Sequence, residues 1–402
     1  MTGTVIIGAG QAGASLAAKL RALGYDKPIT MIGEEPVAPY QRPPLSKAYL
    51  LGEMALDRLY LRPPSFWQAQ EVDMRLGTSV DAIDLAAKTV AVGGDNLSYD
   101  QLALTTGADP RRLPASIGGD LEGVFTVRNL ADVDRMVPEF REGRRLLIVG
   151  GGYIGLEAAA VGAKLGLKVT LIEMAPRILG RVAAPETAAY FRQLHAAHGV
   201  EILENSGLER LTGEGRVAAA VLSDGREIPV DFVIAGVGVT PRTALAEKAG
   251  LEIDNGIRTD AFGRTSDPSV WAAGDCASFP HGDIRLRLES VGNAIDQAEI
   301  VAENMLGAGK AYAAKPWFWS DQHDVKLQIA GLNTGYDRII TRHGENGTAS
   351  FWYYRGDRLL ALDALNDARA YMVGKRLIEA GRSPDPALVA DAASDLRALL
   401  KS

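Results

Sequence analysis

Three glycines near the N-terminus have a spacing that lets the backbone approach a phosphate group. Gly8, Gly10 and Gly13 directly follow the apolar run Val5–Ile7, and a helical pattern of apolar residues comes after them. The first glycine permits a tight turn, the second leaves room for a pyrophosphate, and the third lets helix and strand pack closely. The N–H groups at a helix start also favour negative charge. We therefore interpret this stretch as a dinucleotide-binding turn.

The same arrangement of strand, glycine turn, helix, strand and acid occurs twice in the chain. In the first copy, Glu34 follows the second apolar strand, where a carboxylate can accept hydrogen bonds from ribose hydroxyls. In the second copy, Gly150, Gly152 and Gly155 are followed by a helix, a strand and Glu173. Because the glycine motif recurs in the same structural context, we predict two dinucleotide sites.

The acid of the second copy predicts which nicotinamide cofactor is used. A carboxylate at Glu173 suits the free 2′-hydroxyl of NAD and repels the 2′-phosphate of NADP. Arg177 and Arg181 lie nearby in the sequence and oppose this preference. We expect NADH to be the substrate.

Other candidate positions follow short apolar strands later in the chain. Gly236 and Gly238 come directly after one strand, and they mark either an approach to the nicotinamide ribose or an ordinary turn. Asp275 follows another, at the strand end where open α/β sheets bind ligands, and it can accept a hydrogen bond from a ribityl hydroxyl. The adjacent Cys276 is interpreted as a structural residue.

Composition excludes several classes of protein. The 402 residues carry a net charge of −7, which argues against general nucleic-acid binding. A single cysteine excludes an internal disulfide, a redox-active cysteine pair and a metal cluster held mainly by cysteines of this chain, so electrons need a bound cofactor. The apolar runs stay well below the roughly 18 residues of a membrane span. Because the first strand begins near Thr4, we expect no signal peptide and a cytoplasmic protein.

The pattern predicts an α/β fold with two Rossmann-like dinucleotide-binding domains, in a glutathione-reductase-like arrangement, and a C-terminal α+β domain. The C-terminal domain combines strands of alternating apolar and polar residues with helices near residues 368–380 and 390–400. The expected boundaries are 1–108 with 242–314 for the discontinuous FAD-binding domain, 109–241 for the NAD-binding domain, and 315–402 for the C-terminal domain.

A proline-rich loop follows the first dinucleotide motif and ends near Lys47. Proline fixes its own backbone and biases the preceding residue to extended geometry, so residues 39–44 form a stiff connection. We expect a helix to begin near Leu45 and to place Lys47 in its first turn. Spacing alone makes Lys47 an ordinary surface lysine.

Taken together, these motifs resemble the FAD-dependent, NADH-specific ferredoxin reductases, a family that includes putidaredoxin reductase and the reductase components of aromatic-ring dioxygenases. The resemblance covers essentially the whole chain, and the Pro-Pro-Leu-Ser-Lys and Trp-Phe-Trp-Ser-Asp stretches are its most specific parts. The segments that carry it are residues 8–13, 42–47, 150–157, 273–275 and 316–321, with 289–291 and 336–340 favouring the putidaredoxin reductase branch.

The resemblance implies a set of cofactor contacts. FAD binding is expected at Gly8, Gly10, Ala12, Gly13, Glu34, Arg42, Lys47, Val80, Thr106, Arg128, Asp275 and Val291. NAD binding is expected at Gly152, Tyr153, Ile154, Glu157, Glu173 and Gly238.

Three residues are expected to act at the reacting atoms. The resemblance places Lys47 beside the reactive edge of the flavin ring and pairs it with Glu157, since a buried ammonium needs a partner. It places Trp319 near the flavin ring and the path of the nicotinamide. Packing within an aromatic-rich core is the alternative for Trp319.

The resulting hypothesis is an enzyme that takes a hydride from NADH onto FAD and passes single electrons to a 2Fe-2S ferredoxin, which serves a cytochrome P-450 monooxygenase. The alternatives are a rubredoxin reductase or NADH oxidase, and a non-enzymatic NADH sensor like apoptosis-inducing factor. We expect a monomer or weak dimer with no nucleic-acid or membrane partner. Opposite charge would steer an acidic ferredoxin to a local basic face, with Arg285, Arg287, Lys326 and Arg338 as candidates.

Overall fold

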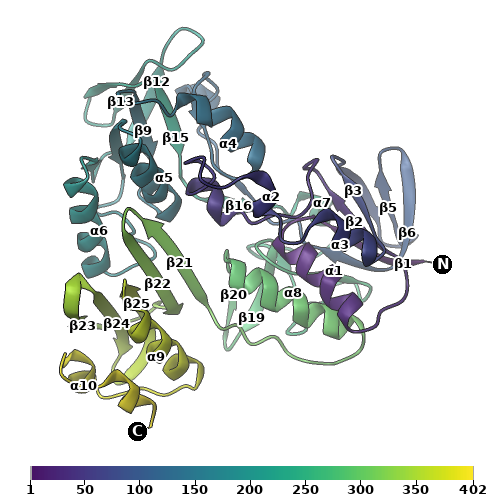
Figure 1. The fold of residues 1–402 in the computed structure, drawn as a ribbon. Helices are drawn as coiled ribbons and strands as arrows, with labels where there is room; N and C mark the ends of the chain where they lie inside the picture. The colour runs from purple at the N-terminus through teal and green to yellow at the C-terminus, as the bar shows by residue number, and fades with distance from the viewer. Residues whose placement is uncertain (1, 402) are drawn as a thin grey trace. The chain divides into compact units, whose positions relative to one another are not determined.

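A computed structural model describes residues 2–401 and divides them into two compact units, each built from several stretches of the chain (Figure 1). The first unit comprises residues up to 42, 55–109 and 239–316, and the second comprises 43–54, 110–238 and the residues from 317 onward. None of the helices formed by residues 2–401 has the length and apolar character needed to cross a membrane.

The first unit is organised around a seven-stranded sheet in the order β3-β2-β1-β6-β5-β4, with β18 also paired to β6. The strands β3, β2, β1, β6 and β18 are parallel, and β4 and β5 form an antiparallel hairpin. The bounds are β1 (Gly3–Ile7), β2 (Ile29–Gly33), β3 (Val72–Leu76), β4 (Val80–Asp84), β5 (Thr89–Val92), β6 (Asp95–Leu104) and β18 (Val270–Ala272). The central strand β1 is buried along its whole length, which explains its continuous apolar sequence.

Two helices far apart in the sequence pack side by side in the first unit. They are α1 (Gln11–Ala22) and α8 (Val291–Met305), drawn in purple and green in Figure 1. Leu16 and Leu20 from α1 share a buried cluster with Ala298 and Val301 from α8. The pairing brings the beginning of residues 291–305 into the unit that holds the first glycine turn.

The remaining elements of this part of the chain are short. They are α2 (Leu56–Leu59), α3 (Pro64–Ala69), α7 (Ala244–Lys248), the sheet of β17 (Ile257–Arg258), β19 (Ala277–His281) and β20 (Ile284–Leu286), and the pair of β7 (Ala108–Pro110) and β16 (Val239–Pro241).

The second unit repeats the architecture of the first with a parallel five-stranded sheet in the order β11-β10-β9-β15-β8. Its first four strands follow the same route as β3-β2-β1-β6, so the duplication seen in the glycine motifs extends to strand order. The fifth strand differs, because β18 follows the other four in the chain whereas β8 precedes them. The bounds are β8 (Val124–Phe125), β9 (Arg145–Val149), β10 (Lys168–Ile172), β11 (Glu201–Leu203) and β15 (Phe232–Ala235), with α4 (Leu130–Met136), α5 (Tyr153–Lys164) and α6 (Pro185–Ala197). A small antiparallel sheet adds β12 (Leu208–Thr212), β13 (Ala219–Leu222) and β14 (Glu227–Pro229).

The C-terminal part of the second unit is an antiparallel five-stranded sheet in the order β21-β22-β25-β24-β23. Its bounds are β21 (Trp317–Gln322), β22 (Val325–Gly331), β23 (Arg338–His343), β24 (Ala349–Arg355) and β25 (Arg358–Leu365), followed by α9 (Ala368–Glu379). The helix lies close to the sheet because residue 374 is glycine: a Cβ there would be 2.4 Å from Leu362 Cδ2. The predicted fold class, two Rossmann-like sheets and a C-terminal α+β region, is confirmed, whereas the predicted domain boundaries stay a prediction.

The predicted final helix at 390–400 is wrong. A short helix, α10 (Pro386–Ala390), is followed by a turn and a 3-10 helix over Leu396–Leu400. The buried guanidinium of Arg342 donates hydrogen bonds to the carbonyls of Val389, Asp391, Ala392 and Ser394. Carbonyls held in this way are not arranged for the helical i to i−4 pattern, so the helix is interrupted.

We predict that Arg342→Ala lowers the free energy of unfolding by about 2–4 kcal/mol, because four carbonyls lose the donor that holds this segment in place. Urea unfolding measures this change, and limited proteolysis should then cut within residues 385–400. Arg338→Ala on the same strand is the control, since its side chain is 44% exposed. Equal stabilities of the two variants would contradict the role given to Arg342.

Candidate functional site

The first glycine turn presents open N–H groups at the start of α1. Gly10 precedes the helix, and because glycine has no side chain it cannot cap the first turn. A Cβ on Gly10 would meet no atom within 4 Å, whereas a Cβ on Gly8 would lie 2.1 Å from the Thr105 carbonyl oxygen. A Cβ on Gly13 would lie 2.0 Å from the Gly8 carbonyl oxygen. Two of the glycines therefore permit close packing, and the third leaves space suited to a pyrophosphate.

Three predicted residues come from segments that pack around this turn. Ala12 is buried in the first turn of α1, and a Cβ on Gly274 would lie 3.0 Å from its Cβ. Asp275 follows Gly274 directly, and Val291 begins the helix α8 that packs on α1. The structure thus brings Ala12, the backbone leading to Asp275, and α8 together.

Arg242 contacts two further predicted residues, Glu34 and Thr106. It was not itself predicted from the sequence. Its Nη2 lies 2.8 Å from Glu34 Oε2, and its Nε donates to Asp109 Oδ2 at 2.8 Å. The Thr106 hydroxyl donates to the Arg242 carbonyl oxygen at 2.7 Å. Glu34 keeps 48% of its side chain exposed, so it is oriented by the arginine while facing solvent. Nothing in the local sequence Thr-Pro-Arg-Thr marks Arg242 for this task.

Two other predicted flavin contacts also lie in the first unit. The Arg42 guanidinium lies 2.6 Å from Glu35 Oε1, and the Tyr40 hydroxyl donates to the same carboxylate. Burial opposes the charge of Arg42, but Tyr40, Glu35 and Asp275 hold its pKa above the ordinary value. Val80 is half-buried at the start of β4.

The second glycine turn has the same close backbone contacts as the first. Gly152 precedes α5, and a Cβ on it would meet no atom within 4 Å. A Cβ on Gly150 would lie 2.4 Å from the Gly236 carbonyl oxygen, and one on Gly155 would lie 2.3 Å from the Gly150 carbonyl oxygen. Gly236 therefore lies against the turn itself. Ile154, in the first helical turn, keeps 43% of its side chain exposed.

Glu173 is held in place by backbone donors beside the second turn. Its Oε2 accepts from the Gly151 N–H and its Oε1 from the Ala175 N–H, both at 2.8 Å. The carboxylate is thereby fixed at the end of β10, next to the open glycine turn. Gly238 has a φ of 97°, which favours glycine, and its carbonyl accepts from the Arg111 N–H at 2.9 Å.

Lys47 forms a buried ion pair with Glu157, as the resemblance implied. Its Nζ lies 2.7 Å from Glu157 Oε2, and the exposed fractions of the two side chains are 17% and 4%. The α-helix predicted to begin near Leu45 does not form among the described residues of this loop. Residues Pro43–Ser46 form a 3-10 helix instead, with the Lys47 N–H donating to the Pro44 carbonyl at 3.0 Å.

Two serines that sequence reasoning missed complete the surroundings of Glu157. The Ser46 hydroxyl donates to Oε2 at 2.6 Å and the Ser320 hydroxyl donates to Oε1 at 2.7 Å. Burial raises the pKa of Glu157 above its ordinary value, and the ammonium of Lys47 together with both hydroxyls opposes this shift without cancelling it. All of these partners donate to the carboxylate, so the arrangement suits its ionised form.

Helix α5 and strand β21 match in spacing, which explains how Ser320 reaches Glu157. Tyr153 and Glu157 are four helical residues apart, or about 6 Å along the axis. Phe318 and Ser320 are two strand residues apart, or about 6.7 Å, and point to the same face. Tyr153 packs on Phe318 with ring centroids 4.9 Å apart, and Ser320 meets Glu157 one step further along.

Trp319 lies between Phe318 and Ser320 on β21 and therefore points to the opposite face of the strand. Its ring stacks on Trp317 with centroids 5.6 Å apart. The side chain is half-buried, so stacking accounts for part of its surroundings. Its expected position near flavin and nicotinamide stays a prediction. Arg128, which precedes α4, also stays a predicted flavin contact.

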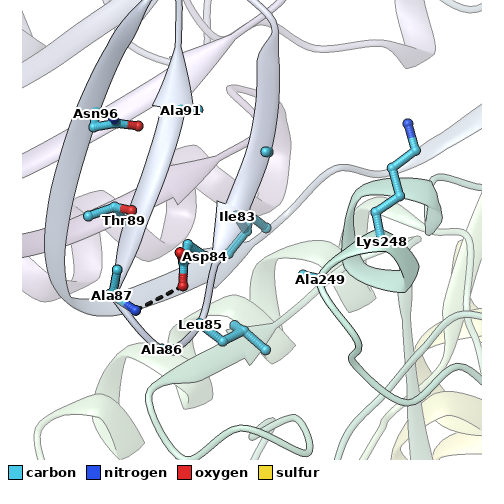
Figure 2. Close-up of a pocket in the computed structure, with 11 residues that line it drawn as sticks. Ile83, Asp84, Leu85, Ala86, Ala87, Thr89, Ala91, Asn96, Lys248 and Ala249 are labelled. Carbon is cyan, nitrogen blue, oxygen red and sulfur yellow. Dashed lines mark hydrogen bonds between the residues drawn. The ribbon is translucent and has the colours of Figure 1, made fainter.

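An open pocket in the first unit offers no competing site (Figure 2). It lies between the β4–β5 hairpin and α7, and five of its eleven lining residues are alanines. Its carboxylate, Asp84, accepts a hydrogen bond from the Ala87 N–H at 2.8 Å and so closes the hairpin turn. None of the predicted site residues lines it.

The expected basic face stays a prediction, and of its four candidates Lys326 is exposed. Arg285 donates to the carbonyls of Thr259 and Ser278, Arg287 pairs with Glu289 at 2.6 Å, and Arg338 pairs with Asp357 at 3.5 Å. These guanidinium groups are engaged within the chain. They are therefore weaker candidates for a docking surface than the sequence suggested.

Comparison with known proteins gives a consistent result over the whole chain. Residues 2–298 match the family model described as pyridine nucleotide-disulphide oxidoreductase, and residues 317–400 match the one described as reductase C-terminal. A ferredoxin–NAD(P)+ reductase from a Sphingomonas species is 44% identical over 392 residues, covering 96% of this chain and 94% of that protein. Putidaredoxin reductase from Pseudomonas putida is 40% identical over 406 residues, covering 98% of this chain and 96% of that protein.

A solved structure supports the same relationship. The crystal structure of a covalent putidaredoxin reductase–putidaredoxin complex contains a chain that matches with a TM-score of 0.95 and 38% identity. The match covers 100% of this chain and 98% of that chain.

We predict that Lys47→Met lowers the free energy of unfolding by about 3 kcal/mol, because it leaves Glu157 charged and buried without its partner. Adding Glu157→Gln should recover much of this loss. Without Lys47 the folded-state pKa of Glu157 rises further, so the protonated carboxyl is favoured and the loss should shrink as pH falls. Urea unfolding of the single and double variants measures these effects.

The exposed pair Lys164–Glu53 provides the control, since it has the same 2.7 Å separation with more than half of each side chain exposed. Lys164→Met should cost less than about 1 kcal/mol. Strictly additive effects of the Lys47 and Glu157 changes would contradict an energetic link between them.

Proposed function

Because the chain belongs to the pyridine nucleotide-disulphide oxidoreductase family, we propose that it takes a hydride from NADH onto bound FAD and passes single electrons to a 2Fe-2S ferredoxin. Bound flavin supplies the chemistry of accepting two electrons together and releasing them one at a time. The residues of the chain bind and orient the two cofactors and set the charge around them.

The observation that carries this proposal is the duplicated glycine turn. Both copies start a twelve-residue helix with a glycine that leaves open space, and both rely on two other glycines for close packing. Two nucleotide sites in one chain fit electron transfer between two bound cofactors. The single cysteine is buried, so disulfide chemistry fits less well. The full-length similarity to ferredoxin reductases supports the nature of the electron acceptor.

In this proposal, the first turn holds FAD. The exposed N–H groups of α1 bind its pyrophosphate, and Glu34, oriented by Arg242, accepts from its ribose. Asp275 accepts from the ribityl chain. The geometry of Gly8, Gly10 and Gly13 fits such a group, because the turn is open only at the middle glycine.

The second turn holds NADH in the proposal. The N–H groups of α5 bind the pyrophosphate, and the exposed Ile154 and half-buried Tyr153 are available beside it. Glu173 faces the adenosine ribose, where its fixed negative charge selects against a 2′-phosphate. The Lys47 ammonium, held in place by Glu157, supplies a positive charge that favours an electron-rich flavin ring.

The same resemblance extends the proposal to the redox partner and setting. We propose that the ferredoxin serves a cytochrome P-450 monooxygenase, that the reductase acts in the cytoplasm, and that it works as a monomer or weak dimer. These points rest on sequence resemblance rather than on geometry.

The proposal is tested with the purified chain under anaerobic conditions. We expect the oxidised spectrum of a flavoprotein, release of FAD on denaturation, bleaching by NADH, and rapid reduction of an added 2Fe-2S ferredoxin. Preferential reduction of rubredoxin, or fast NADH consumption under air without a carrier, would overturn the ferredoxin assignment. A long-lived reduced complex that passes electrons to no acceptor would indicate a sensor. A colourless protein would overturn the flavoprotein assignment.

We predict that Glu173→Ala raises the KM for NADH about tenfold and narrows the preference for NADH over NADPH, because a charged hydrogen bond and a repulsive charge are both lost. FAD content should stay at the wild-type level. Glu173→Gln is the matched variant, since it removes the charge while keeping a side chain of the same length. Loss of flavin with unchanged NADH affinity would show that the two nucleotide sites are assigned in reverse.

A further inference from the structure

A continuous chain of hydrogen bonds leads from Glu157 to the surface of the second unit. Ser320 Oγ donates to Glu157 Oε1 at 2.7 Å, and Gln322 Nε2 donates to Ser320 Oγ at 3.1 Å. Gln322 Oε1 lies 2.9 Å from His195 Nε2, and His195 Nδ1 lies 3.2 Å from His323 Nε2. Five side chains, from β21, α5, α6 and the hairpin turn after β21, are thereby linked end to end.

The chemistry of these groups gives every hydrogen bond the same direction. Because the Gln322 amide nitrogen donates to Ser320, the Gln322 amide oxygen faces His195 and accepts from it. His195 must therefore carry its proton on Nε2. The other nitrogen of a neutral His195 ring then accepts, so His323 must donate from Nε2. From His323 to His195, Gln322, Ser320 and Glu157, each group donates toward the carboxylate. Such an aligned series polarises each successive bond and ends on a negative charge.

The members of this chain are buried except at its outer end. Ser320, Gln322 and His195 are each 0% exposed, and His323 is half-buried. His198 is exposed and stacks on His323, with ring centroids 3.8 Å apart and an interplanar angle of 15°. Glu157 is therefore connected to a pair of surface imidazoles by side chains that water does not reach.

His323 lies in the tight turn between β21 and β22. It is the first of the two turn residues and has a φ of 54°, in the left-handed region that favours glycine. Histidine is among the non-glycine residues that adopt this conformation more often than most. The turn therefore accommodates the imidazole, which reaches His195.

Two other roles fit these residues less well. No group of three or more histidine, cysteine or acidic side chains among residues 2–401 is arranged to hold a metal ion. Proton conduction would require the Gln322 amide to lose an N–H proton while its oxygen gains one, which is a costly rearrangement. Orientation and polarisation remain as the functions that every member of the chain can perform.

We propose that Ser320, Gln322, His195 and His323 form a positioning relay, which fixes the Glu157 carboxylate in its ionised form and directs it at Lys47. This proposal rests on the proposed function, because it matters to catalysis only if Lys47 and Glu157 act on the flavin. The relay moves no proton and no electron. It sets the geometry and charge of the ion pair before reaction.

The electrostatics of the histidines agree with this arrangement. Burial lowers the pKa of His195 to about 4, with His198 nearby adding to the effect and Gln322 opposing it. Burial, His195 and His198 lower the pKa of His323 to about 4, and Asp324 opposes them. Both rings are therefore neutral above pH 5, so the aligned donor pattern persists in the neutral range. Glu157 itself faces Lys47, Ser46 and Ser320.

The direction of the relay is tested by two-bond nitrogen–proton NMR of the 15N-histidine-labelled protein with its bound flavin. The chain has five histidines, so single substitutions assign them. We expect neutral rings protonated on Nε2 for both His195 and His323 from pH 8 down to pH 5. A ring of His195 protonated on Nδ1 would overturn the proposal whether or not the protein reduces a ferredoxin.

The effect on the ion pair is tested by Ser320→Ala in stopped-flow reduction by NADH. Losing this donor to the ionised carboxylate raises the pKa of Glu157. The acid limb, which is the fall of the flavin reduction rate as pH is lowered through this pKa, should therefore move up by about one pH unit. The rate at neutral pH should fall about tenfold, with the KM for NADH unchanged. An acid limb that stays at its wild-type pH would overturn the proposal.

A matched pair at position 195 separates the hydrogen bond from simple packing. Glutamine can place a donor near the position of His195 Nε2, whereas asparagine is too short to reach Gln322. His195→Gln should reduce flavin within about twofold of the wild-type rate, and His195→Asn should be about tenfold slower. His343→Gln, at the exposed end of β23, is the control and should match the wild type. Equal rates for the two variants at position 195 would overturn the relay.

These outcomes are separable from failure of the proposed function. If NADH reduces the bound flavin but no ferredoxin accepts the electrons, the relay can still be confirmed or refuted by the acid limb of flavin reduction. If the protein proves to hold no flavin, the tautomer of His195 still decides whether the aligned chain exists.

Discussion

A buried carboxylate beside a lysine is the constraint on which the second unit depends. Removing a charge from water is costly unless a partner and hydrogen bonds replace the water, and Glu157 is 3% exposed. Its partners come from segments far apart in the sequence: Lys47 and Ser46 from the 3-10 turn and Ser320 from β21. One charge therefore ties a short proline-rich loop and a C-terminal hairpin to helix α5. The spacing match between the helix and the strand makes this possible without strain.

The two nucleotide motifs share their backbone design but differ in how they hold the acid. Glu173 is fixed by two backbone N–H groups at the end of β10, whereas Glu34 is oriented by the side chain of Arg242. A carboxylate held by the backbone keeps its position as ligand comes and goes, which suits a site that discriminates between substrates. A carboxylate held by an arginine side chain has more freedom. The glycine turn is thus the same in both copies, while the acid after each second strand is held in a different way.

The sequence predicted the regular parts of this molecule well, because they follow from local physics. Glycine spacing, apolar strands and the recurrence of the motif were sufficient for both Rossmann-like sheets. The Pro-Pro-Leu-Ser-Lys and Trp-Phe-Trp-Ser-Asp stretches indicated the family. The failures were non-local. Arg342 draws on carbonyls near residues 389–394 and interrupts a segment whose own pattern is helical. Arg242, Ser320, Gln322 and His195 acquire their roles from partners far away in the chain, and a single sequence carries no signal for such contacts.

The whole interpretation depends on electrons entering in pairs and leaving singly. The measurement that tests this most directly is the anaerobic stoichiometry between NADH oxidised and ferredoxin reduced, followed at the same time by their separate absorbance bands. Transfer through one bound flavin predicts two ferredoxins reduced for each NADH consumed, with one proton released. A ratio of one to one, or NADH oxidation without reduced ferredoxin, would contradict it.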